Sequence, residues 1–371
     1  MKKLQYINNS IGMFDLFKGV AMIMIALAHT TGLFQIDISE ARFSILFILA
    51  AVIEAGKGFL MPVFFIIFGY GLRKRSVVRA TAGQFRDMVI PYLLTALITI
   101  VLNFVFHYAF FRYIPGAVSE TVQLLYGELY GTSETVTLFG KTFFACGPIW
   151  FLLALFWAVC IFNVLLSFFS DNVLPFAVCT VSVIGWGIGC LAAVPWCFSQ
   201  GMVGVLYVYF GYYLKRKKAL NLPLDYKAVI FSIIIVVSEL LLAVFRLSGN
   251  IADKDYPLGP ISYIINGLFG IVILYMAVRV NIIKGVFSDA IKTVGGYSLY
   301  FLCIHSIEMI AFPWYMVAER FSDRQMLGIA VIFSTRLIVI FIGCFVFVAV
   351  KRRIWASKSR GEKNNERRRS N

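Results

Sequence analysis

The sequence is poor in charged residues and poorer still in histidine. Only 14% of its 371 residues are charged, whereas 60% are hydrophobic, and it has three histidines. No Walker, GxGxxG, GxSxG or HExxH motif is present, which argues against an ATPase, a zinc enzyme and a serine hydrolase. The seven cysteines lack CxxC spacing. We therefore expect no bound cofactor and no metal.

Long apolar runs take the place of charge, and they predict an all-α integral membrane protein. A hydrocarbon core about 30 Å thick needs helices of roughly 20 residues. About ten transmembrane helices are expected, at residues 12–34, 44–72, 87–111, 147–169, 173–195, 200–214, 228–247, 258–278, 295–317 and 326–350. They form one membrane domain, 12–350, between a cytoplasmic segment, 1–11, and a basic disordered cytoplasmic tail, 351–371.

Acidic residues are also scarce, with 19 against 34 basic ones and a net charge of +15. If the N-terminus is cytoplasmic, most basic residues fall on cytoplasmic segments, as the positive-inside rule requires. The long outer loop, 112–146, has few of them. Both termini are therefore predicted to be cytoplasmic, where the charge faces anionic membrane lipid and no nucleic acid.

One short pattern occurs twice. The sequences FGYGLRKR (68–75) and FGYYLKRK (210–217) are each expected to end a helix at the cytoplasmic surface. Cations at a helix C-terminus are favourable, so two helices could converge on this exit sequence. A structural repeat would explain the pattern equally well.

The first span is unusual because it carries Asp15, Lys18 and His29. On a helix, Lys18 and His29 lie within about 20° of the same face and about 16 Å apart along the axis. Ionisable residues inside a span usually face the bundle interior or a water-filled cavity, so the stripe predicts a functional site. The alternative is that Lys18 snorkels to the surface while His29 bonds a neighbouring helix.

The sequence DLFKGVAMIMIALAH (15–29) resembles the first helix of the acyltransferase family 3 membrane O-acyltransferases. Four later segments resemble further blocks of that family in the expected order: MPVFFIIFGYGLRKR (61–75), VIPYLL (89–94), GPIWFLLAL (147–155) and GGYSLYFLCIH (295–305). The resemblance implies ten helices and transfer of an acyl group, expected to be acetyl, from cytosolic acyl-CoA. The acceptor would be a hydroxyl of a cell-envelope carbohydrate or related molecule at a bacterial plasma membrane.

The same resemblance implies roles for individual residues. His29 is the expected general base, with Asp15 as a second catalytic residue. Acyl-CoA is the expected co-substrate, and the expected donor-binding residues are Lys18, Arg73, Arg75 and Arg79. Lys18 stands where the family usually has arginine. Candidates for substrate contact or proton transfer are His305, Glu308 and Trp150.

Several alternatives remain open at this level. His305 could be a core histidine, Trp150 could be packing, and His107 fits an aromatic belt at the membrane surface. Glu239 and Arg336 are charges inside spans that the sequence does not pair, and either could belong to the site. The whole polar stripe could instead serve a transporter of a small solute such as an amino acid, or the protein could be a membrane scaffold.

Overall fold

A computed structural model describes residues 12–34, 45–223 and 225–370 of the protein. It is about 80% helical. Its helices are α1 (Asp15–Thr31), α2 (Ile45–Gly71), α3 (Val77–Gln84), α4 (Ile90–Phe111), α5 (Ile114–Tyr130), α6 (Trp150–Phe168), α7 (Leu174–Leu191), α8 (Phe198–Arg216), α9 (Tyr226–Val244), α10 (Pro260–Val280), α11 (Val286–Gly296), α12 (Ser298–Ala311), α13 (Trp314–Glu319) and α14 (Gln325–Ser370). A π-helical turn, η2 (Phe85–Val89), joins α3 to α4.

Within the described residues, seven helical segments are long and apolar enough to cross a membrane, or eight if the bent pair α11–α12 is one span. The all-α membrane fold is thus confirmed, whereas the predicted count of ten is not reached by this measure. The apolar part of α2 that is described, Gly56–Gly71, is shorter than a full span. Helix α8 carries polar residues and four tyrosines over its 19 residues. A bend of 75° separates α11 from α12.

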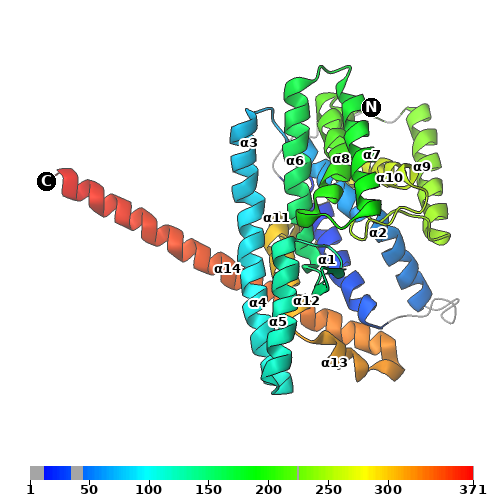
Figure 1. The fold of residues 1–371 in the computed structure, drawn as a ribbon. Helices are drawn as coiled ribbons and strands as arrows, with labels where there is room; N and C mark the ends of the chain where they lie inside the picture. The colour runs from blue at the N-terminus through cyan, green and yellow to red at the C-terminus, as the bar shows by residue number, and fades with distance from the viewer. Residues whose placement is uncertain (1–11, 35–44, 224, 371) are drawn as a thin grey trace.

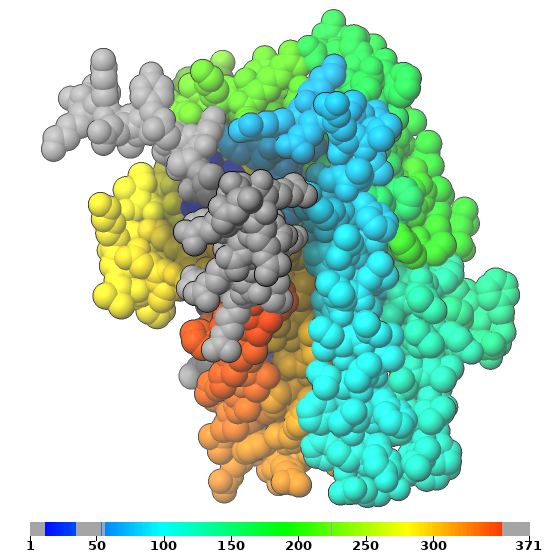
Figure 2. Space-filling view, turned by 90° about the vertical axis from the view of Figure 1, so that its left-hand side faces the viewer, coloured from blue at the N-terminus to red at the C-terminus, as the bar shows by residue number. Residues whose placement is uncertain are grey.

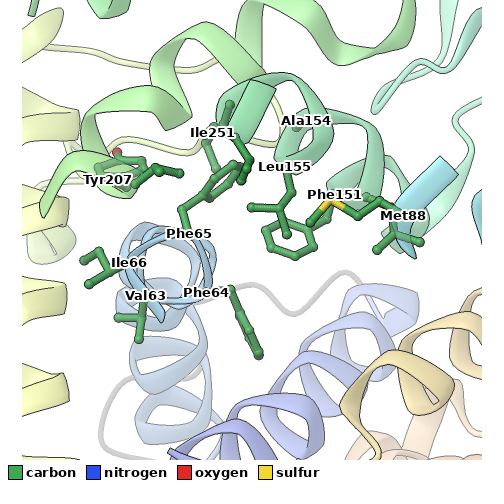
Figure 3. Close-up of a cluster of buried hydrophobic side chains, with 14 of the residues drawn as sticks. Val63, Phe64, Phe65, Ile66, Met88, Phe151, Ala154, Leu155, Tyr207 and Ile251 are labelled. Atoms are coloured by element: carbon green, nitrogen blue, oxygen red, sulfur yellow. The ribbon is translucent and has the colours of Figure 1, made fainter. Parts of the chain in front are cut away.

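The apolar core lies where α2, α6 and α8 meet (Figure 3). Helix α6 is the most enclosed of the candidate spans, because 83% of its apolar stretch is buried inside the protein. Phe65 of α2 packs edge-on against Phe151 of α6, with ring centroids 5.1 Å apart, and also contacts Tyr207 of α8. This core holds α2 rigidly beside α1, along which the polar stripe runs.

The repeated FGY pattern marks the crossing of α2 and α8. A Cβ on Gly69 would collide with the carbonyl oxygen of Val208, and a Cβ on Gly211 would collide with the carbonyl oxygen of Ile66. Each glycine therefore meets the residue three positions before the other glycine. Small residues permit such close approach of membrane helices. The pattern is a reciprocal packing motif, which favours the structural repeat.

Segment 112–146, expected to be a loop, is largely ordered. Helix α5 packs along α4, and strands β1 (Val136–Leu138) and β2 (Lys141–Phe143) form an antiparallel hairpin. Figure 1 shows α3 and α4 as one column with α5 beside its far end, and Figure 2 shows this column as a continuous ridge. The hydrophobic pattern missed α5 because its apolar residues are interrupted by Ser119, Glu120 and Gln123.

The lipid-facing surface and the tail complete the fold. Exposed apolar side chains cover the outer faces of α4, α7, α9 and α14, among them Val101, Ile234 and Ile338. Such contiguous apolar exposure is expected of a protein surrounded by lipid. The backbone of residues 351–370 continues α14 as far as Ser370 (Figure 1), and the expected disorder of this tail stays a prediction. The division into domains stays a prediction.

Candidate active site

The residues of the predicted polar stripe lie at the two ends of helix α1, with Asp15 and Lys18 at one end and His29 at the other. Lys18 Nζ lies 2.6 Å from Asp15 Oδ1, and both side chains are about one-fifth exposed. His29 lies in the last turn, about 16 Å from Lys18 and about 21 Å from Asp15 along the axis. Asp15 therefore positions Lys18, at the opposite end of the helix from His29.

The side chain of His29 opens into a cavity of about 310 Å³, named the His29 cavity. Trp150, the first residue of α6, forms part of its wall and is otherwise buried. Apolar residues line most of the cavity, and Lys57, Asn250 and Asp253 add polar groups to the wall. A small molecule could thus reach the imidazole without crossing the packed core.

His305 lies beside His29, with the two ring centroids 5.4 Å apart. It is fully buried, and its Nδ1 is 2.8 Å from Glu308 Oε1, one turn further along α12. A carboxylate only accepts hydrogen bonds, so Nδ1–H of His305 is the donor, and Nε2 of the neutral form of the ring can take up a proton. Among the described residues, Nε2 has no hydrogen-bond partner. His305 is thus oriented by Glu308 with a basic nitrogen left over.

Glu308 is the centre of a buried network. Arg336 of α14 donates from Nε to both of its carboxylate oxygens, over 3.0 and 3.2 Å. Trp314 Nε1 donates to Glu308 Oε2 over 2.7 Å. Arg336 Nη1 donates to Thr30 Oγ1 over 3.1 Å, which leads back to the residue after His29. Three helices, α1, α12 and α14, are thereby fixed around the histidine pair.

A second, basic cavity lies at the Lys18 end of α1 and encloses about 500 Å³. Lys18, Arg73 and Arg75 line it together with Asp87. The π-helical turn η2 places Asp87 on this wall, and π-helical turns are frequent at functional sites. We name this space the basic cavity.

A small apolar cavity of about 90 Å³ lies between the two. It shares the wall residues Phe64 and Phe68 with the basic cavity. It shares Ile25, Met61 and Leu302 with the His29 cavity. The three spaces therefore lie next to one another along α1, in the order basic cavity, narrow apolar cavity and His29 cavity, and we name this series the channel.

Comparison with protein families gives a match to an acyltransferase domain over residues 11–351. The chain belongs to the acyltransferase 3 family. The protein is therefore a multi-pass membrane acyltransferase, a transferase that acts on groups other than aminoacyl groups. Comparisons with curated proteins and with solved structures gave no significant match.

Most of the predicted residues of this acyltransferase line the channel or its buried network. His29 and Trp150 border one chamber, while Lys18, Arg73 and Arg75 border the basic cavity. Arg79 of α3 is exposed and lines neither cavity. His305 and Glu308 are buried behind His29 rather than open to the chamber.

The sequence singled out Arg336 as a possible member of the site without its partner, and it did not reveal Thr30 and Trp314. Arg336 stood out only as a charge without a partner, and the structure pairs it with Glu308. Thr30 and Trp314 have no charge, so only the geometry identifies them. The third histidine, His107, contacts Glu120 on α5 through its Nδ1 and lines neither cavity.

Proposed function

We propose that this acyltransferase moves an acyl group, expected to be acetyl, from acyl-CoA to a hydroxyl group presented in the His29 cavity. The observation that carries the proposal is the channel, since it places a basic cavity and an accessible imidazole along one helix. A donor molecule with a charged end and a long, less polar arm would fit the basic cavity with its first part and the apolar cavity with its second. Acyl-CoA has phosphates at one end and a thioester at the other.

The basic cavity is the proposed donor site. Lys18, Arg73 and Arg75 supply cations for the phosphates of the donor, and charge-assisted bonds of this kind are the strong ones. Asp15 holds Lys18 in position through the 2.6 Å ion pair. Arg79, exposed at the surface, contributes to attracting the anionic donor. The extended thiol arm would then reach through the narrow apolar cavity toward His29.

The chemistry follows from the position of His29. Its imidazole takes the proton from the acceptor hydroxyl as the hydroxyl oxygen attacks the thioester carbonyl. The new C–O bond forms, the C–S bond breaks, and the imidazolium returns the proton to the departing sulfur of CoA. His305 supports this cycle as an oriented second base, because Glu308 fixes its tautomer. Trp150 offers a flat apolar face for the acceptor.

The acceptor side is the wall of the His29 cavity that carries Lys57, Asn250 and Asp253. Polar groups beside an aromatic ring suit a carbohydrate, whose hydroxyls need hydrogen-bonding partners. This supports a carbohydrate as the acceptor, and we propose that it belongs to the cell envelope at a bacterial plasma membrane. No observation favours the transport alternative over transfer.

The deciding experiment measures CoA released from acetyl-CoA by the purified, reconstituted protein supplied with envelope glycan and lipid extract. We expect turnover in the wild type and its loss in His29→Gln. His107→Gln is the matched control, because it removes a histidine outside the channel. Equal turnover in His29→Gln and wild type, or no turnover in the wild type with a full range of acceptors, would overturn the proposal.

A further inference from the structure

A second buried polar cluster lies behind the wall of the His29 cavity. Glu239 of α9 is 0% exposed and Asn266 of α10 is 1% exposed. Ser248 and Gly249, in the turn that follows α9, complete the group, which we name the Glu239 cluster. None of these residues belongs to the channel or to the Glu308 network.

Two side-chain oxygens of the Glu239 cluster take no part in its hydrogen bonds. Ser248 Oγ donates to Glu239 Oε1 over 2.7 Å, and Asn266 Nδ2 donates to the carbonyl oxygen of Gly249 over 2.6 Å. Glu239 Oε2 and Asn266 Oδ1 are buried and receive no hydrogen bond from the described residues. Two buried acceptors without donors in one cluster call for a positively polarised partner.

Helix α2 closes the cluster at Gly58. A Cβ on this glycine would lie 2.6 Å from Glu239 Oε1 and 3.3 Å from Asn266 Nδ2, and would collide with Ser248 Oγ. The polar atoms of three separate segments therefore crowd around one point of α2. A larger residue at this position would have to displace these side chains, so Gly58 leaves the cluster its present arrangement.

Charge favours a cation as the missing partner. An ionised carboxylate inside a membrane protein needs a compensating positive charge, and no ion pair to Glu239 is found among the described residues. Carboxylate, amide, hydroxyl and carbonyl oxygens are the ligands that hard cations prefer. Unwound segments and helix C-terminal ends are where membrane proteins coordinate monovalent cations, and Ser248 lies in the turn that follows α9.

The charge of the ion follows from the number of carboxylates. Among the described residues, no group of three His, Cys, Asp or Glu side chains forms a metal site. The Glu239 cluster has one carboxylate, which a single positive charge neutralises, whereas a divalent ion would leave an excess charge in a low-dielectric site. A monovalent ion is therefore the best match.

We propose that Glu239, Ser248 and Asn266 form a binding site for a monovalent cation such as Na⁺ in the wall of the His29 cavity. Gly249 precedes Asn250 and Gly58 follows Lys57, and both of these neighbours line the cavity. Binding of the ion would therefore fix two sides of the chamber. The inference does not depend on the proposed reaction, because cation binding is measured without turnover.

The test is thermal unfolding of the purified full-length protein at one pH and at a constant ionic strength of about 0.15 M. Na⁺ is compared with choline, which is too large for the cluster. We expect Na⁺ to raise the wild-type midpoint by about 2–4 °C. In Glu239→Gln the midpoints in Na⁺ and choline should coincide. The control is Glu319→Gln, which changes an exposed carboxylate of α13 and should keep the full response.

A second variant covers the case in which Glu239→Gln fails to fold. Asn266→Asp adds a second carboxylate to the cluster, and Ca²⁺ should then raise the midpoint over that in choline, while the wild type gains nothing from Ca²⁺. Two results would overturn the proposal. One is equal wild-type midpoints in Na⁺ and choline, and the other is a Na⁺ response of wild-type size in Glu239→Gln.

Discussion

Arg336 of α14 donates to both carboxylate oxygens of Glu308 of α12, in a place where the two side chains are 0% and 5% exposed. The pair joins two helices and, through the contact of Glu308 with His305, sets the orientation of a histidine beside the chamber. One ion pair thereby links the stability of the bundle to the geometry of the site.

Removing only Arg336 should destabilise the protein strongly. In Arg336→Met the carboxylate of Glu308 loses its buried counter-charge, and we expect the free energy of unfolding to fall by about 3–5 kcal/mol. Denaturant unfolding in mixed micelles measures it. The double variant Arg336→Met/Glu308→Gln removes both charges and should recover a large part of the loss. A single variant as stable as wild type would contradict this account of the pair.

Replacing His305 should slow the chemistry without weakening donor binding. His305 lies beside His29 but lines no part of the basic cavity. For His305→Gln we expect kcat to fall by about 10²–10⁴ while KM for acyl-CoA stays unchanged. A structural role alone would lower the thermal midpoint and leave kcat of the folded protein intact, so both quantities are measured.

Lys18 should act on donor affinity. Losing one charge-assisted contact of about 1.5–3 kcal/mol predicts that Lys18→Ala raises KM for acyl-CoA by about 10- to 100-fold with little change in kcat. Lys18→Arg should keep most of the affinity, and Asp15→Asn should weaken it by releasing Lys18. Lys284→Ala is the control, since this exposed lysine does not line the basic cavity. An unchanged KM in Lys18→Ala would remove Lys18 from the donor site.

The narrow apolar cavity should be needed for turnover. Met61 lies where the narrow cavity meets the His29 cavity, so the larger side chain of Met61→Trp would fill the passage. We expect CoA release to fall on the order of 100-fold, since small displacements of the reacting groups have effects of that size. Met276→Trp on the exposed face of α10 makes the same change outside the channel. Similar turnover in both variants would show that the donor does not use this passage.

The sequence predicted what depends on a single helix. The hydrophobic run at 147–169 corresponds to a short 3₁₀ helix, η3 (Gly147–Ile149), and α6, which together cover Gly147–Phe168. The spacing of Lys18 and His29 placed them correctly at the two ends of one face, because both lie on α1. Periodicity and helix geometry suffice for such statements.

Contacts between side chains on different helices could not be predicted from periodicity and helix geometry. Glu308 and Arg336 are 28 residues apart on different helices, so their pairing depends on how α12 crosses α14. The contact between His29 and His305 depends on the same packing.

Glu128 should make the stability of the protein depend on pH. It lies on α5, outside the candidate spans, is 3% exposed, and neither of its carboxyl oxygens has a hydrogen-bond partner among the described residues. Burial raises the pKa of this carboxyl from 4.5 to about 8. Because the unfolded chain ionises near 4.5, the folded state holds the extra proton between these two pH values.

The sign of the effect follows from that proton. As pH rises from 4.5 to about 8, the free energy of unfolding should fall, by up to about 1.4 kcal/mol for each pH unit, and level off above. Glu128→Gln cannot ionise, so its stability should lose this slope and exceed that of the wild type most clearly at high pH. Thermal midpoints measured across the pH range, with Glu319→Gln as an exposed control, provide the check. Parallel curves for wild type and Glu128→Gln would mean that Glu128 reaches water in the folded protein.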